Sequence, residues 1–397
     1  MKFFNALFFC LLCVTTVFSK ESSEIRQPTS EILDTAPLSQ SKEEGAASKI
    51  EEEKYKLPFL IFGDLRHRYE FLYNEQSGKE DHYNQMRLRA RLGAKASPTP
   101  DLDLEFRFAT GPGGVSTNQT YEDGTKGSRN YEFKLDRAFA QWKPQPWGRL
   151  MVGRMTNPFL FVGGHDMIFD SDLNFDGIAV ALSEKWQDLD VTFTASEFLL
   201  DESKDNKGQS DMTLTAGQLA LRAPMSTDFS WAIVASHLAY SQVKDHAAVV
   251  PDGFFGNSNA GSVYLSDFQI NSLGGELTYL STLPVTLFYE FSKNAKASDL
   301  SRASIFGVRW GQLKKSKDWA LTVDMREVEK DSLLGLLTDG DSFGGGANGR
   351  SLRLSAGYNY SKSMTLVLTG LQGKKSIAPG EDSLARDRLQ LDLNFKF

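Results

Sequence analysis

From Leu57 to the end of the chain, apolar and polar residues alternate at every second position, in segment after segment. In the stretch 352–359 the apolar members are Leu352, Leu354, Ala356 and Tyr358, and the polar or small members are Arg353, Ser355, Gly357 and Asn359. A period of two sends successive side chains to opposite faces of a β-strand. Each segment therefore predicts a strand with one apolar face and one polar face.

We count sixteen such segments, and most have about ten residues or more, the length that a tilted strand needs to cross a membrane. They lie near 59–74, 83–96, 101–110, 131–143, 148–154, 175–184, 188–199, 212–223, 227–242, 267–281, 283–294, 302–313, 317–329, 351–360, 363–374 and 385–397. Their connections alternate between short turns, such as Ser97–Pro100, and long loops, such as 243–266. This alternation is typical of outer-membrane barrels, which have an even number of strands. The sequence predicts an all-β fold, a closed antiparallel transmembrane β-barrel of about 16 strands over residues 57–397.

The positions of the tryptophans indicate the same fold independently. All six lie in or beside predicted short turns: Trp142, Trp147, Trp186, Trp231, Trp310 and Trp319. Indole side chains favour the membrane–water boundary. We therefore expect an aromatic girdle at the periplasmic end of the barrel, where the turns are short.

The last segment ends in an unbroken row of alternate apolar residues. The row comprises Leu389, Leu391, Leu393, Phe395 and Phe397. A C-terminal aromatic residue on such a strand resembles the signal by which outer-membrane proteins are recognised for insertion. We therefore expect Phe397 to act as an insertion signal that is read by the outer-membrane assembly machinery. The alternative is an ordinary amphipathic edge strand that ends on phenylalanine by chance.

Two N-terminal segments differ from the rest of the chain. Residues 1–19 place Lys2 before an apolar run and end with small residues suited to cleavage after Ser19, which predicts a signal peptide. The alternative, a membrane helix, needs a longer run. Residues 20–56 are rich in charge and poor in aromatic residues, so we expect a flexible periplasmic tail. A short helix or a partner-binding segment is the alternative there.

The composition excludes several classes of protein. Both cysteines, Cys10 and Cys13, lie inside the signal peptide, so the mature chain would have no disulfide and no thiolate metal site. The net charge of −7 argues against binding to nucleic acid, which requires a clustered basic excess. The mean hydropathy of −0.34 fits a barrel in which only alternate residues face lipid.

Short sequence pieces in a fixed order cover roughly residues 60–180. They include Gly63-Asp64-Leu65-Arg66, Arg87-Leu88-Arg89-Ala90-Arg91, Ala109-Thr110-Gly111, Leu135-Asp136-Arg137-Ala138-Phe139, Gly153-Arg154-Met155, Asn157-Pro158-Phe159 and Asp170-Ser171-Asp172-Leu173. In this order they resemble the putative-porin family of bacterial outer-membrane proteins. The resemblance implies a pore in the outer membrane but names no solute. By analogy with general porins, we also expect a homotrimer.

Arginines are concentrated on the polar faces of the first three predicted strands. They are Arg66, Arg68, Arg87, Arg89, Arg91 and Arg107. The opposite faces are apolar, and arginine facing lipid is costly, so these side chains should point into the lumen. We expect them to line one side of a constriction, where they need acidic partners or water. The alternative is a solvated lumen face with no special role.

One arginine conflicts with this alternation. Arg137 has the spacing of Phe133, Leu135 and Phe139, which should all face lipid. A β-bulge would resolve the conflict, and so would a side chain that reaches up to the headgroups.

The long connection 155–174 carries acids that suit the arginines. Asp166, Asp170 and Asp172 occur there without any lysine or arginine, together with the apolar run Phe159–Val162. In general porins the third outer loop folds into the barrel and places acids opposite an arginine wall, and this arrangement is similar. We expect the three aspartates to face the arginines across the constriction. An outer loop packed on its neighbours is the alternative.

These observations favour an integral outer-membrane porin that lets small hydrophilic solutes and ions diffuse passively. One alternative is a channel specific for an anionic solute, and another is a barrel enzyme or a structural envelope protein. The five histidines have no metal-binding spacing, and no local catalytic motif is present, so we expect no enzyme activity and no cofactor. The expected partners are outer-membrane lipid, the transported solutes and further copies of the chain.

Overall fold

The computed structural model describes residues 59–76, 79–111, 116–121, 130–202, 210–250 and 253–397. Within them the fold is all-β, with sixteen long strands and three short 3-10 turns. The long strands are β1 (Phe59–Gln76), β2 (Lys79–Thr99), β3 (Leu102–Thr110), β5 (Phe133–Gln145), β6 (Gly148–Thr156), β7 (Asn174–Trp186), β8 (Leu189–Asp201), β9 (Met212–Pro224), β10 (Phe229–Ser241), β13 (Gln269–Tyr279), β14 (Val285–Asn294), β15 (Arg302–Gly311), β16 (Trp319–Val328), β17 (Gly349–Ser361), β18 (Met364–Lys375) and β19 (Leu384–Lys396). Each predicted segment corresponds to one of these strands, with ends that differ by a few residues.

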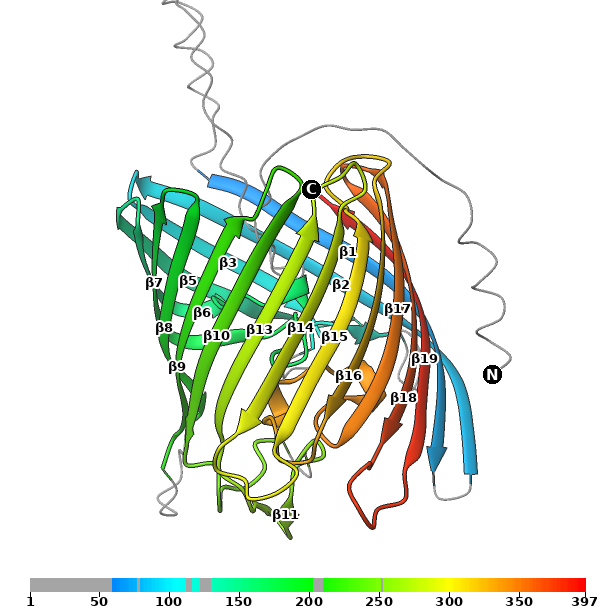
Figure 1. Ribbon diagram of the computed structural model, residues 1–397. Helices are drawn as coiled ribbons and strands as arrows, with labels where there is room; N and C mark the ends of the chain where they lie inside the picture. Colours follow the sequence, from blue (N-terminus) through cyan, green and yellow to red (C-terminus); the bar gives the residue numbers. More distant parts are fainter. Residues whose placement is uncertain (1–58, 77–78, 112–115, 122–129, 203–209, 251–252) are drawn as a thin grey trace, which may run out of the picture.

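The long strands close into a single antiparallel barrel. Each pairs with the next long strand along the chain, and β19 pairs with β1 from Asp64 opposite Lys396 to Asn74 opposite Arg386. Figure 1 shows the short turns at the end where the C-terminus lies and the long connections at the other end. The predicted closed barrel is confirmed.

Three very short strands were not predicted. β4 (Gln119–Thr120) adds to the edge of β2, and β11 (Asn259–Ala260) pairs with β12 (Val263–Tyr264) inside the connection between β10 and β13.

The outer face of the barrel carries a band of apolar side chains. On β14 the outward residues are Val285, Leu287, Tyr289 and Phe291, which alternate with inward residues such as the buried Phe288. The tryptophans lie at the short-turn ends of their strands or in the turns themselves, as predicted. An outward apolar band with aromatic residues at its boundary matches the hydrocarbon layer of a membrane. Among the described residues, no helix is long and apolar enough to cross a membrane.

A β-bulge in β5 resolves the conflict at Arg137. The pairing with β3 shifts between Arg107 and Phe108, so that Arg107 lies opposite Arg137 while Phe108 lies opposite Leu135. The extra residue moves Arg137 to the inner face, where its side chain is buried. Phe139 also turns inward and packs against the core, which corrects the prediction that it faces lipid.

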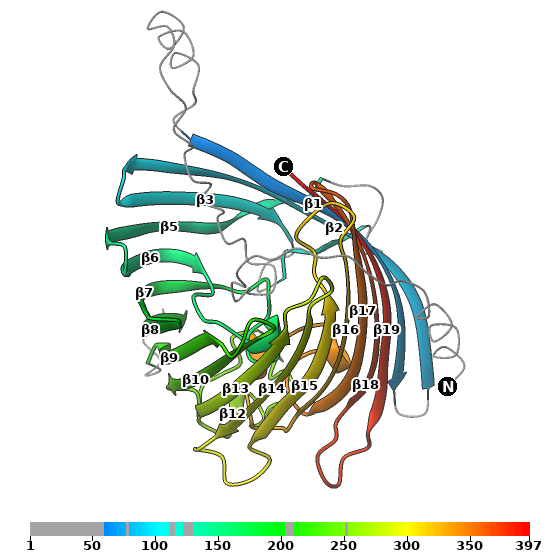
Figure 2. The same ribbon diagram turned by 45° about the horizontal axis from the view of Figure 1, so that its top comes forward.

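The barrel interior is filled in part by its own connections. The connections 157–173 and 329–348 contribute most of their apolar side chains to a buried cluster that also includes the inner faces of β7 to β10. In Figure 2 the 3-10 turns of both connections lie within the ring of strands. The prediction that the third long loop enters the barrel is confirmed, and a second inward connection joins it.

The two ends of the chain concern the predictions of a signal peptide, a tail and a C-terminal insertion signal. The signal peptide (1–19) and almost all of the region predicted as a tail (20–56) lie outside the described residues, so both stay predictions. Phe397 lies at the seam that closes the barrel, where it exchanges two backbone hydrogen bonds of 3.1 Å with Gly63. Its side chain is 69% exposed on the outer face.

Candidate functional site

The inner faces of β1 and β2 carry the predicted arginines in direct cross-strand register. Arg66 lies opposite Arg89, and Arg68 lies opposite Arg87. Directly opposed residues of an antiparallel pair have Cα atoms about 4.5–5.5 Å apart. Like charges at that spacing repel each other, so this face is stable only if carboxylates lie close to it.

Carboxylates of the barrel wall neutralise part of this positive charge. Asp64 accepts hydrogen bonds from Arg91 Nε at 2.6 Å and from Arg89 Nη2 at 2.9 Å. Asp392 of β19 receives Arg68 in a two-pronged contact, with Nε at 2.6 Å and Nη2 at 2.9 Å. Two-pronged pairs between guanidinium and carboxylate combine charge with fixed geometry. They hold the arginine side chains in defined positions on the wall.

The connection 157–173 is anchored first by aromatic packing on the wall from which it leaves. Phe159 packs edge-on against Phe198, and Phe169 packs edge-on against Phe175, with ring centroids 6.4 and 5.1 Å apart. Phe175 and Phe198 stack on the inner face of β7 and β8 at 4.4 Å. The apolar run Phe159–Val162, which suggested an inward loop, therefore fixes the start of that loop to the barrel wall.

The same connection then crosses to the opposite wall. The backbone N–H of Gly163 donates to Glu276 at 2.7 Å, and His165 Nε2 lies 2.7 Å from a carboxylate oxygen of Glu290. Gly163 has φ +61, and a Cβ atom there would lie 2.2 Å from the ring of Phe288. Only glycine fits at this crossing.

The three predicted aspartates of this connection reach three different places. Asp172 forms ion pairs with Arg89 at 3.2 Å and with Arg91 at 3.8 Å. Asp166 pairs instead with Arg326 of β16 at 2.8 Å and Arg353 of β17 at 3.4 Å. Asp170 lies at the contact with the second inward connection, where it accepts from the N–H of Gly340 at 3.2 Å. Only Asp172 lies beside the predicted arginines, and it is in direct contact with them.

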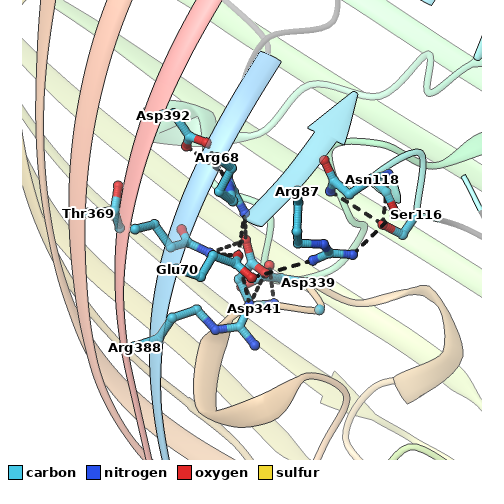
Figure 3. Close-up of polar contacts among 12 residues, drawn as sticks. Arg68, Glu70, Arg87, Ser116, Asn118, Asp339, Asp341, Thr369, Arg388 and Asp392 are labelled. Carbon is cyan, nitrogen blue, oxygen red and sulfur yellow. Dashed lines mark hydrogen bonds and ion pairs between the residues drawn. The ribbon is translucent and has the colours of Figure 1, made fainter. Parts of the chain in front are cut away.

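The second inward connection, 329–348, brings two further acids into the lumen. Asp341 accepts from Arg68 Nη1 at 2.8 Å and pairs with Arg388 of β19, as Figure 3 shows. Asp339 pairs with Arg326 at 3.2 Å. Backbone N–H of Asp170 donates to Leu337 O at 2.8 Å, so the two connections are joined to each other.

A third segment, 116–121, approaches the arginines from the side of β2. Arg66 donates from Nη2 to the side-chain oxygen of Asn118, and Arg87 Nη2 lies 3.4 Å from the backbone oxygen of the same residue. Figure 3 shows Asn118 and Ser116 beside the Arg87 guanidinium. The Nε atoms of Arg66 and Arg87 are buried and have no hydrogen-bond partner within the described chain.

The charges of this cluster do not balance. Its guanidiniums belong to Arg66, Arg68, Arg87, Arg89, Arg91 and Arg388, and its carboxylates to Asp64, Glu70, Asp172, Asp341 and Asp392. With all groups ionised, the described residues of the cluster therefore carry six positive and five negative charges. The sixth predicted arginine, Arg107, lies elsewhere, because it pairs with Asp136 at 2.6 Å and is only 1% exposed.

The acids of the two inward connections divide into two groups by pKa. Burial opposes ionisation of Asp172, but Arg89 and Arg66 outweigh it and lower its pKa. Burial is likewise outweighed at Asp166 by Arg326 and Arg353, which lower the pKa to about 2. Asp170 behaves oppositely, because burial and then the charges of Asp172 and Asp339 raise its pKa well above the usual value.

Sequence reasoning missed the acids and arginines of the second inward connection and its wall. These are Asp324, Arg326, Asp339, Asp341, Arg353 and Arg388. A usable signal was present, because 329–348 combines the apolar residues Leu333, Leu334 and Leu337 with four acids, much as 155–174 combines an apolar run with three.

Comparison with known proteins agrees with this architecture. Residues 72–260 match the family model of the putative porins, which confirms the resemblance seen in the sequence. Among curated proteins, none matches the chain.

Several solved structures share the fold. OprB of Pseudomonas putida, in a high-pH structure, is 12% identical over 89% of this chain and 97% of that chain, with a TM-score of 0.56. A mutant porin of Rhodopseudomonas blastica is 10% identical over 85% of this chain and 100% of that chain, with a TM-score of 0.48. Salmonella typhi OmpF in complex with daunomycin is 13% identical over 85% of this chain and 97% of that chain, with a TM-score of 0.49. At these identities, the likeness to OprB supports the barrel fold, and the two lower scores add nothing to it.

Proposed function

Because this chain is an integral outer-membrane porin, we propose that it is a passive diffusion channel for small hydrophilic solutes and ions, with a constriction that favours anions. The family and the fold point to a channel rather than an enzyme. In this proposal the passing solute meets the arginine cluster together with the acids of the two inward connections, Asp172 and Asp341, that contact it.

The observation that carries the anion preference is the unused hydrogen-bonding capacity of Arg66 and Arg87. Among the described residues, the Nε–H of each has no hydrogen-bond partner, although Arg66 Nε lies 3.9 Å from a carboxylate oxygen of Asp392. The described cluster around them has one more guanidinium than carboxylates. At physiological salt, charges more than about 8 Å apart are largely screened from each other. The passing ion therefore senses this local excess more than the net charge of −7 of the whole chain.

The test is the reversal potential of single channels in a planar bilayer under a salt gradient. Replacing both arginines (Arg66→Gln with Arg87→Gln) should shift the permeability ratio toward cations by roughly twofold or more at low salt, and the shift should fade at high salt. Arg154→Gln is the matched control, because Arg154 pairs with Asp176 on the outer face of β6 and β7. If the double variant keeps the reversal potential of the parent, these side chains do not line the conducting path.

We also propose that the porin assembles as a homotrimer through the outer face of β8 to β13. Several outward positions there are small or polar, where a lipid-facing wall would carry large apolar residues. They include Ala195, Glu197, Thr215, Gly217, Ala235, His237, Asn271 and Gly275. His237 and Asn271 form a hydrogen bond of 2.8 Å on this exposed face. Close packing against another copy would suit such a surface better than contact with lipid does.

A further inference from the structure

The inner wall of the barrel is strongly basic between the arginine cluster and the short turns, a region that we call the inner vestibule. Seven cations of the described strands point inward there: Lys95, Lys143, Arg149, Lys185, Arg222, Arg309 and Lys396. Glu105 also points inward but pairs with the buried Arg137 at 3.4 Å, which leaves three acids: Asp103, Asp190 and Glu276. With all these groups ionised, seven cations against three acids leave an excess of four positive charges.

The short turns beside the inner vestibule do not offset this excess. They contribute four acids and four lysines: Asp101, Asp188, Asp228, Asp318, Lys314, Lys315, Lys317 and Lys362. Short turns lie at the periplasmic end of barrels of this type. The described wall is therefore basic at its periplasmic end, although the whole chain has a net charge of −7.

The positive excess includes a patch on four neighbouring strands, β2, β3, β5 and β6 (Figure 2). Asp103 of β3 accepts a hydrogen bond from Lys143 Nζ of β5 at 2.6 Å and pairs with Lys95 of β2 at 3.2 Å. Arg149 of β6 lies opposite the irregular stretch of β5 that contains Lys143. The Arg149 side chain has no hydrogen bond or ion pair with another described residue. Apart from the paired Glu105, the patch therefore has three cations and one acid.

This patch is more accessible than the arginine cluster. The side chains of Arg66 and Arg87 are only 12% and 17% exposed, whereas Arg149 is exposed and the Lys143 side chain is 37% exposed. Arg149 can thus bind an ion without first giving up a partner within the described chain. Lys95 follows Arg91 on the inner face of β2, so the patch begins directly below the cluster. An anion that leaves the cluster toward the periplasm meets the patch next.

We propose that Lys95, Lys143 and Arg149 form a second anion site on the periplasmic side of the constriction, which holds multivalent oxyanions such as phosphate. The three cations exceed Asp103 by two charges, so a dianion would balance the patch and a chloride ion would not. A guanidinium binds two oxygens of one phosphate, and the lysine amines add point charges. The low-dielectric wall of a narrow lumen strengthens the attraction. The site rests on the proposed channel, since the solute reaches it through the lumen, but it does not require Arg66 and Arg87 to set the selectivity.

The test is the block of single-channel chloride current by inorganic pyrophosphate, added to one chamber of a planar bilayer at a time. The parent should be blocked at a lower concentration from one chamber than from the other, because the site lies on one side of the constriction. High salt should weaken this block, since the lumen charges are then screened.

Two variants should move the blocking concentration in opposite directions. Arg149→Gln should raise it by roughly threefold on the more sensitive side, the size expected for an ion pair in contact with water. Asp103→Asn should lower it, because Lys95 and Lys143 then lose their acid, and a merely structural effect would not produce this opposite sign. Lys315→Gln is the matched control, since it removes one exposed charge from a short turn, and it should keep the parent's value.

Three results would overturn the proposal: equal block of the parent from both chambers, an unchanged blocking concentration in Arg149→Gln, or a weaker block in Asp103→Asn. The double variant Arg66→Gln with Arg87→Gln separates this site from the proposed anion preference, because its reversal potential should change while the block remains. If the chain does not conduct, the proposed function fails by itself. Calorimetric titration of the detergent-solubilised chain with pyrophosphate then decides, and equal affinity of the parent and Arg149→Gln would exclude the site.

Discussion

At the scale of the residue, the inner wall depends on the shape of the arginine side chain. A guanidinium presents five donors in a planar fork, so one arginine can satisfy two carboxylates at once. Arg68 does this with Asp392 and Asp341, and Arg326 does it with Asp166 and Asp339. A lysine at either place would supply a point charge without fixing both partners. The arginines thus connect the wall to the two inward connections.

The seam residue Phe397 combines two roles that can be separated. Its backbone bonds to Gly63 extend the pairing of β1 and β19, and its ring lies over Gly63, where a Cβ atom would come within 2.6 Å of it. We predict that deletion of Phe397, or its replacement by aspartate, lowers the outer-membrane yield and leaves degraded or periplasmic material. Lys396→Gln, at the neighbouring inward position, is the control and should keep the yield of the parent. Quantitative blots of membrane fractions measure the yield. If the deletion variant keeps the yield of the parent and is still heat-modifiable, a signalling role for Phe397 is contradicted.

At the scale of the element, period-two alternation was enough to find all sixteen long strands, because burial and lipid contact select opposite faces at every position. It could not find the bulge at Arg137, since a single inserted residue is a local departure that changes the facing of all that follows. Nor could it place Asp166 or Asp341. A loop's course is fixed by tertiary contacts, such as that of Gly163 with Phe288, and these do not repeat along the sequence.

The stability of the contact between the two inward connections should depend on pH. Burial and neighbouring acids raise the pKa of Asp170 above 3.8, so its contribution to stability is present in acid and is lost as the pH rises through the folded-state pKa. We predict that Asp170→Asn becomes more stable than the parent as the pH rises from 4 to 9, with an unfolding temperature higher by about 2 °C or more at the alkaline end.

Asp341 provides the control of opposite sign. Burial opposes its ionisation, but Arg388 and Arg68 lower its pKa, so its stabilising contribution is present above about 3.8 and is lost as the pH falls below that. Asp341→Asn should therefore be less stable than the parent at pH 7 and approach it in acid. Thermal unfolding of the barrel, followed by circular dichroism at each pH, gives the unfolding temperatures of both variants and the parent. A difference between Asp170→Asn and the parent that does not change with pH would contradict the account of the junction.

At the scale of the whole molecule, the outer surface is divided into two kinds of wall. β1 to β3 and β14 to β19 present large apolar residues, among them Tyr69, Phe106, Phe291 and Leu391. β8 to β13 also present large apolar residues, such as Phe193, Ile233 and Leu273, but the small and polar residues named above lie between them. A monomeric barrel contacts lipid on every side, so it would not require this asymmetry. A trimer requires one wall that contacts protein, while the remaining walls contact lipid and its headgroups.

Two glycines make this division testable. Gly217 on β9 and Gly370 on β18 both occupy outward positions, and a Cβ atom at either would meet nothing within 4 Å. The barrel alone should therefore tolerate tryptophan at both sites. We predict that Gly217→Trp reduces the proposed trimer to monomers, because the indole would fill the space that a closely packed second copy requires. Gly370→Trp should leave the proposed trimer intact, with its indole in lipid. Light scattering of the detergent-solubilised proteins, with heat-modifiability as the measure of folding, gives the number of copies. A monomeric parent would refute the trimer, and loss of the trimer in Gly370→Trp alone would place the protein interface on the opposite wall.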